Sequence, residues 1–122
     1  MGNARVTFHQ LIQDSQEYGS DDEHMVSRVF FSLQVDGGSY PILHVDVKQT
    51  VGAEFENAPL EVGPPHGYNG PFNHEEFRNA VEEYYRGLVG SQGSAIRIKG
   101  GAGPIRMYNN RFASESVVEF PV

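Results

Sequence analysis

Two polar side chains on a predicted strand are the sharpest candidates for chemistry in this chain. His44 and Asp46 are separated by one residue, and residues two apart on a strand point to the same face of a sheet. An imidazole beside a carboxylate can bind a ligand, carry a proton near neutral pH or begin a metal site. A divalent metal needs three or four ligands, and the sequence does not show whether His9, His24, His66 or His74 lies near this pair. We therefore predict no metal site.

An irregular segment supplies two further candidates. Residues 52–72 hold four prolines and several glycines, and long connections of this kind often bind ligands or cover a site. Within this segment His66 and Tyr68 place an imidazole and a phenol next to glycine and proline. One hypothesis is a small-ligand or enzyme site between the sheet and this loop, with His44, Asp46, His66 and Tyr68 as polar contacts. The alternative is a rigid surface loop beside the polar face of a hairpin.

Motifs for covalent catalysis, cofactors and phosphate are not found. The chain has no cysteine and no G-x-S-x-G sequence, so no activated nucleophile is indicated. The glycine-rich residues 99–104 resemble a phosphate loop, but Pro104 lacks an N–H donor and strand-like residues follow. The acidic residues 14–24 lack the spacing of an EF-hand. We expect no cofactor, and an enzyme is the less favoured class.

Composition indicates one small acidic domain. The chain has 122 residues, a mass of 13.5 kDa and a net charge of −7, which is enough for a single self-sufficient core over residues 1–122. The acidic balance argues against general binding to nucleic acids or anionic membranes. No apolar run approaches the roughly 20 residues that span a bilayer, and the amino terminus has no signal-peptide core. We expect a soluble, cytoplasmic protein.

The charge is unevenly distributed along the chain. Residues 1–96 carry a net charge of −9 and residues 97–122 a net charge of +2, an asymmetry suited to pairing within the fold or between subunits. Arg97 and Lys99 alternate with isoleucines, so we expect both on an exposed face that attracts an acidic partner. A nucleic-acid role is the least favoured reading. It would rest on Arg97, Lys99, Arg106 and Arg111.

One helix is strongly specified, over residues 73–90. Asn73 can cap its start with Glu76 three residues later, and Phe72 and Phe77 flank the cap as a hydrophobic staple. Apolar residues then recur at the helical spacing of one buried stripe: Phe77, Ala80, Val81, Tyr84 and Leu88. This pattern predicts a surface helix laid across a core.

Most of the remaining chain reads as antiparallel strands. The first strand is predicted over residues 5–13, with Val6, Phe8 and Ile12 on one face. A hairpin is centred on residues 36–39, and a three-residue loop would set Leu33 opposite Leu43 and Phe31 opposite Val45. A short strand is expected within residues 54–62. After the helix, strands are expected at residues 95–99, 105–108 and 114–120.

These elements predict an α+β fold. About six mostly antiparallel strands, three before the helix and three after it, form a curved sheet or half-open barrel with the single helix packed on one face. Phe30 falls on the strand face opposite its apolar neighbours, and Ile42 points the same way. The second sheet face is then covered either by the long loop or by a partner. We expect a binding or assembly module that associates with itself as a homodimer, or with another protein, through Phe30, Ile42, Arg97 and Lys99.

Overall fold

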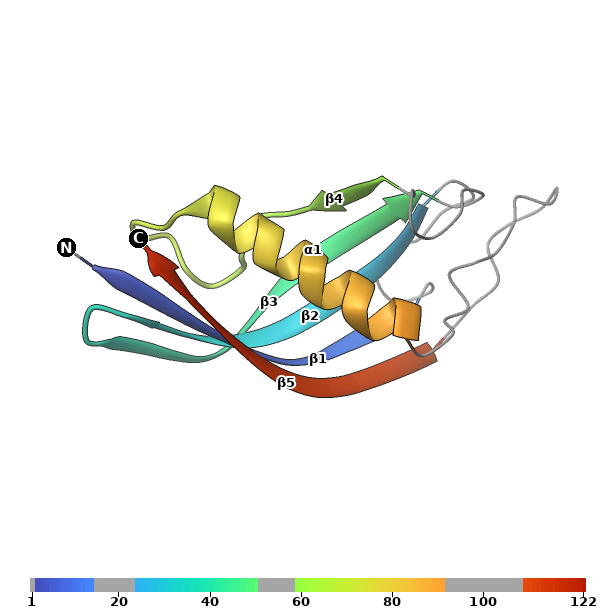
Figure 1. Ribbon diagram of the computed structural model, residues 1–122, viewed down its shortest axis with the longest axis horizontal. Coiled ribbons are helices and arrows are strands. Elements are labelled where there is room, and N and C mark those ends of the chain that lie inside the picture. The colour runs from blue at the N-terminus through green and yellow to red at the C-terminus, as the bar shows by residue number, and fades with distance from the viewer. Residues whose placement is uncertain (1, 15–23, 51–58, 92–108) are drawn as a thin grey trace, which may run out of the picture.

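The computed structural model describes residues 2–14, 24–50, 59–91 and 109–122. They form one antiparallel sheet with one helix on its concave side (Figure 1). The predicted α+β class with a single helix on one sheet face is confirmed, and the sheet is open rather than a half-open barrel. In chain order the elements are β1 (Asn3–Asp14), β2 (His24–Val35), β3 (Gly38–Thr50), β4 (Leu60–Val62), α1 (His74–Ser91) and β5 (Asn109–Pro121).

The strand count differs slightly from the prediction, with five strands in the described part of the chain rather than about six. The short strand expected within residues 54–62 is the three-residue β4, and the one expected over residues 114–120 is part of the longer β5. The strands expected over residues 95–99 and 105–108 lie outside the described residues.

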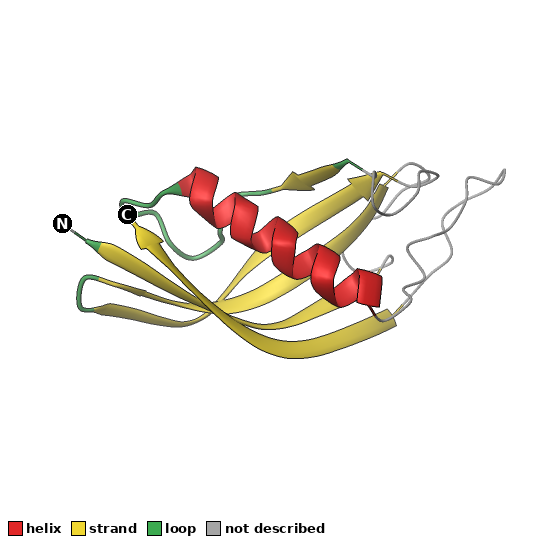
Figure 2. Cartoon of the chain, in the orientation of Figure 1, coloured by secondary structure: helices red, strands yellow, loops and turns green. Residues whose placement is uncertain are grey.

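The strand order β4-β3-β2-β1-β5 explains how the helix is placed. Neighbouring strands β1, β2 and β3 follow one another along the chain, whereas β4 and β5 lie at opposite edges of the sheet. The chain must therefore cross the sheet between β4 and β5, and α1 lies in that crossing (Figures 1 and 2). One face of the sheet is covered by α1, and we call the opposite face the outer face.

The start of α1 is fixed by the residues that predicted it. The Glu76 amide donates to Asn73 Oδ1 at 3.1 Å, and the Phe77 amide donates to the Asn73 carbonyl at 3.0 Å. The rings of Phe72 and Phe77 pack with centroids 5.0 Å apart, as a hydrophobic staple requires. Local sequence thus determines where the helix begins.

The hairpin between β2 and β3 has a different register from the predicted one. Its two-residue turn is Asp36-Gly37, and both residues have positive φ, 43° and 84°, as in type I′ turns. The predicted partners are wrong, since Phe31 lies opposite Leu43 and Leu33 opposite Tyr40. A bulge in β3 between these two pairs restores the common apolar face.

A second irregularity lies in β1. Phe8 pairs with Phe31 of β2 and Gln10 pairs with Phe30, so His9 is an extra residue on β1. This bulge turns two consecutive polar residues toward the outer face and shifts the alternation beyond them. Leu11 is therefore on the core side, whereas Ile12 pairs with Arg28 on the outer face, contrary to the predicted alternation of Val6, Phe8 and Ile12.

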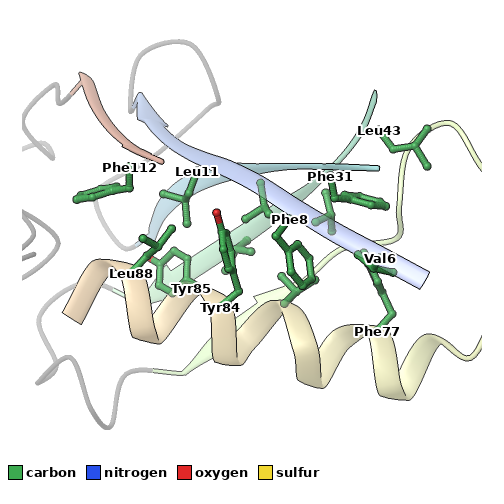
Figure 3. Packing of buried hydrophobic residues seen from close by; sticks show 14 of the residues in the cluster. Val6, Phe8, Leu11, Phe31, Leu43, Phe77, Tyr84, Tyr85, Leu88 and Phe112 are labelled. Carbon is green, nitrogen blue, oxygen red and sulfur yellow. The ribbon is translucent and has the colours of Figure 1, made fainter. Parts of the chain in front are cut away.

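The core lies between the sheet and α1. Figure 3 shows Phe8 and Phe31 of the sheet meeting Phe77 and Tyr84 of the helix. The Phe8 ring stacks on Tyr84 at 4.7 Å between centroids, and the Phe31 ring lies 5.1 Å from Phe77. Burial of each large apolar side chain contributes about 1.5–3 kcal/mol. This contact holds the crossing helix against the sheet.

A cluster of buried polar side chains lies under the second half of α1. Tyr85, Gln13, Ser27 and Gln49 are all inaccessible to solvent, and the Tyr85 hydroxyl donates to Gln49 Oε1 at 2.6 Å. Burial, the larger effect, raises the pKa of Tyr85, while hydrogen bonds with Ser27 and Gln13 act in the opposite direction. Tyr85 is thus a neutral donor inside the core.

Candidate functional site

The structure brings His44 and His66 together. His66 forms an isolated antiparallel bridge to His44, and its amide donates to the His44 carbonyl at 2.8 Å. The two imidazole rings stack with centroids 4.6 Å apart and 18° between their planes. Residues 60–66 follow the edge of β3, first as β4 and then through this bridge. His66, at the end of this segment, therefore lies beside the part of β3 that carries His44.

Asp46 lies on the outer face with His44, as their spacing predicted, but it is engaged elsewhere. Arg28 is its cross-strand partner on β2 and donates from Nε to Oδ1 at 2.8 Å and from Nη2 to Oδ2 at 3.2 Å. This two-bond contact is the geometry that guanidinium and carboxylate groups favour. Asp46 thus serves first as the counter-charge of Arg28 rather than as a base beside His44.

The surroundings of His44 favour its neutral form. Burial lowers the pKa of this imidazole, and the positive charges of Arg28 and His66 lower it further, against an opposing effect of Asp46. The Phe30 ring lies 6.2 Å from the His44 ring on the same face. His44 is therefore half-buried between two rings and a guanidinium, as an uncharged group that can donate or accept a hydrogen bond.

Tyr68 does not join this group. Its ring packs 5.0 Å from Tyr40 and 5.7 Å from Phe72, beside the hydrophobic core on the helix side of the sheet. Its hydroxyl donates to the Pro71 carbonyl at 2.9 Å. The four residues proposed as polar contacts of one ligand are consequently divided, with His44, Asp46 and His66 together and Tyr68 apart.

The described residues do not form a metal site. Within the described ranges, no three His, Cys, Asp or Glu side chains are gathered closely enough to hold an ion. The bidentate contact with Arg28 also occupies both oxygens of Asp46. His44 and His66 alone would give two ligands, fewer than a typical protein zinc site uses.

A series of hydrogen-bonded side chains on the outer face was not predicted from the sequence. His9 Nε2 lies 2.5 Å from Ser32 Oγ, and His9 Nδ1 lies 3.3 Å from Glu115 Oε2. Ser32 Oγ donates in turn to the Pro41 carbonyl at 2.7 Å. The contacts therefore link β5, β1, β2 and β3. The sequence signal was the break in alternation at Phe8-His9-Gln10-Leu11, because such breaks accompany bulges.

The order carboxylate, imidazole, hydroxyl is that of a nucleophilic triad, but the geometry assigns a different role. The single hydroxyl hydrogen of Ser32 is directed to the Pro41 carbonyl, so it is not directed to His9 Nε2 as a triad would require. The Glu115 side chain is 73% exposed, and water screens its charge. We interpret these contacts as structural, because they connect four neighbouring strands at the bulge.

Exposed apolar side chains mark the same face. Ile42 is 66% exposed and Val117 is 47% exposed, and they are the exposed large hydrophobic residues in the described part of the chain. Phe30 is half-buried on the same face, with its ring 6.2 Å from that of His44. Of the four residues predicted at an interface, Phe30 and Ile42 therefore share the outer face. Arg97 and Lys99 lie outside the described residues.

Two hollows lie away from the predicted ligand residues. A polar hollow of about 420 Å³ on the outer face is lined by Arg5, Thr7, Ser32, Gln34, Ser39 and Pro41. A larger one, of about 770 Å³, lies between α1 and β5. The predicted pocket between the sheet and residues 52–72 stays a prediction, because residues 51–58 of that loop lie outside the described residues.

Comparisons with known proteins identify no relative. No protein-family model matches the chain, and searches of curated proteins and of solved structures also find no match. The described part of the chain contains no helix with the length and apolarity needed to cross a membrane.

Proposed function

We propose that this protein is an assembly module that pairs with a second copy of itself through the outer face of the sheet. The observation that carries the proposal is the position of Ile42 and Val117, whose exposed side chains lie on the face that α1 leaves uncovered. A contiguous apolar patch is typical of surfaces that bind another protein, and pairing of two copies would bring these two separate side chains into contact.

The two exposed residues lie on one line across the sheet. Val117 on β5 pairs with Thr7 on β1, and Thr7 pairs with Ser32 on β2. Ser32 lies opposite the bulge of β3 that contains Ile42. A two-fold axis parallel to the strands, between β1 and β2, would set Ile42 of one copy against the partner's Val117, twice. The short side chains of Thr7 and Ser32 would let the two sheets approach between these contacts.

The size of the outer face suits such a pairing. Four long strands spaced about 4.8 Å apart, with 12 residues rising about 3.4 Å each, give a face of roughly 19 by 40 Å. This is about 800 Å² of sheet per copy. Its end at Ile12 and Val26 is already buried, and the rest approaches the area that each partner contributes to a stable protein interface. Sheets pack face to face at about 10 Å in the same way within β-sandwiches.

The electrostatics of the face also favour burial. Arg28 and Asp46 neutralise each other through two hydrogen bonds, and the lowered pKa of His44 favours its uncharged form. Burial of a charge that is already paired and hydrogen-bonded costs much less than burial of an isolated charge. Arg28, Asp46 and His44 can therefore lose their water without leaving an uncompensated ion among the three.

Charge exchange between the two exposed positions tests this geometry. Ile42→Lys and Val117→Glu should each weaken self-association, because each places a charge against an apolar side chain twice per dimer. The combined Ile42→Lys/Val117→Glu variant should regain association, because each lysine then meets a glutamate of the partner. Sedimentation velocity at several protein concentrations measures the self-association of the three variants. Equal loss in the combined variant and in the single variants would contradict the proposed pairing.

A further inference from the structure

The hollow between α1 and β5 is a groove along the edge of the sheet, on the side away from the outer face. Its volume is about 770 Å³, which falls in the usual range of ligand sites. Phe8, Tyr84 and Phe120 give it an apolar floor, and the backbone of β5 forms one wall. It is therefore separate from the surface proposed for self-association.

The helix wall of the groove is a stripe of acidic and small residues. Glu76, Ala80, Glu83 and Gly87 follow one another at spacings of four, three and four, which keeps them on one side of α1. The two glutamates are exposed. Ala80 and Gly87 have small side chains and leave space beside them. The stripe thus presents negative charge beside room for a bound chain.

Gly87 is not explained by packing. A glycine inside a helix is less stable there than alanine, and helix glycines usually have a packing reason. A Cβ atom at position 87 would meet nothing within 4 Å and would project into open space. The packing of the described residues does not require this glycine, and the open space beside it lies in the groove.

All four charged residues that line the groove are acidic. Glu76 and Glu83 come from α1, and Glu115 and Glu119 come from β5. Glu115 contacts His9 at 3.3 Å on the outer side of β5. A segment lying along β5 would therefore have carboxylates on both of its sides, those of α1 toward the core and those of β5 toward the outer face.

Among the described strands, β5 is also an edge strand of the sheet. In the described part of the chain β5 pairs with β1 alone, and it is 13 residues long. About half of the backbone N–H and C=O groups of an edge strand point away from its neighbour and can pair with an added strand. Extended peptides are recognised in this way at other sheet edges, with side-chain pockets supplying specificity.

We propose that this groove binds an extended, basic peptide segment of a partner protein, which adds to β5 as a sixth strand. Its backbone pairs with the free edge of β5. Side chains alternate along a strand, so its Lys or Arg side chains meet Glu115 and Glu119 on the outer side. Its apolar side chains lie over Phe8 and Phe120 on the side of α1, where Glu76 and Glu83 add negative charge. The carboxylates select a basic segment, and Gly87 leaves the groove wide enough to admit it.

The test uses a capped peptide of three Lys-Val repeats, with three Glu-Val repeats as the control peptide. Binding is followed by fluorescence anisotropy and by amide chemical shifts in the full chain. The Lys-Val peptide should shift the amides of β5 in preference to those of β4, and the Glu-Val peptide should not bind. Gly87→Lys should weaken binding by about tenfold or more, because it places bulk and positive charge in the groove. Gly87→Ala, which adds one methyl group, should keep most of the affinity.

Three results would overturn the proposal. These are no binding of the Lys-Val peptide at millimolar concentration, equal binding of the two peptides, or equal affinity of Gly87→Lys and the unmodified protein. Both Gly87 variants introduce good helix-forming residues, so their folding is expected to be intact and is verified by circular dichroism. Binding in the groove does not depend on self-association, so Ile42→Lys should bind the peptide normally.

Discussion

The rings of His44 and His66 stack at 4.6 Å, and one backbone hydrogen bond joins the same two residues. Two imidazoles at this distance cannot both be charged without repulsion, and Arg28 adds a third positive group near His44. The pair therefore couples the stability of this part of the sheet to pH.

Acid is expected to destabilise the protein through His44. Burial first, then Arg28 and His66, lower the pKa of this group in the folded chain below its ordinary value of 6.5. As the pH falls below about 6.5, the unfolded chain takes up this proton before the folded chain does. The free energy of unfolding then decreases until the pH has passed the lowered folded-state pKa. Above that window the group is neutral in both states and contributes no pH dependence.

Urea unfolding of the wild type and of His44→Gln, at pH values of about 7.5 and 5, measures this effect. The wild type should lose more stability over the interval than His44→Gln, since carboxylates titrate in both proteins and cancel in the comparison. An equal loss in the two proteins would show that His44 is not responsible.

Contacts between residues close together in the sequence were predictable at this site, and contacts between residues far apart were not. His44 and Asp46 share a face because the side chains of a strand alternate, which is a local rule. His66 reaches His44 only because the chain turns back along β3, and the same turn carries Tyr68 to the other side of the sheet. No local pattern distinguishes these two outcomes.

The same contrast holds for the fold. The start of α1 was predicted because Asn73 and its flanking phenylalanines act within one turn of each other. The hairpin register was wrong because a tight turn and a bulge compensate for each other, and both depend on how the whole sheet packs. The bulge at His9 was missed for the same reason, although Leu11 was a visible signal.

The buried hydroxyl of Tyr85 should contribute more to stability than that of Tyr84. Tyr85→Phe would leave Gln49 Oε1 without its donor inside the core, which costs about 1–3 kcal/mol. Tyr84 donates to the Ser114 carbonyl at 2.7 Å at the edge of the groove, where burial raises its pKa to about 12 but water can replace the bond. Denaturant unfolding of both Phe variants gives the comparison. Greater destabilisation by Tyr84→Phe would refute this ranking.

The helix cap should be measurable on its own. Asn73→Ala removes the acceptor of the Glu76 amide and should lower the free energy of unfolding by about 1 kcal/mol. Asn79→Ala makes the same chemical change on the exposed helix surface and should be neutral or slightly stabilising. Thermal unfolding of the two variants compares them directly, and similar melting temperatures would argue against the cap.

Gly87→Ala should stabilise the protein. The added methyl group meets open space, so the substitution gains helix propensity without a clash and should raise the free energy of unfolding by roughly 0.5–1 kcal/mol. Urea unfolding measures the gain. A loss of stability would show that Gly87 is required by packing, and would remove one argument for an open groove.

Self-association through the outer face is tested most directly by the mass of the protein in solution. Light scattering on tag-free protein at tens of micromolar should give twice the chain mass of 13.5 kDa. Ile42→Glu should give the single chain mass, because it places a charge on the most exposed apolar residue of that face. Arg78→Glu, an exposed charge change on α1, should remain a dimer. A wild-type protein of 13.5 kDa, or an Ile42→Glu variant that is still dimeric, would contradict the account.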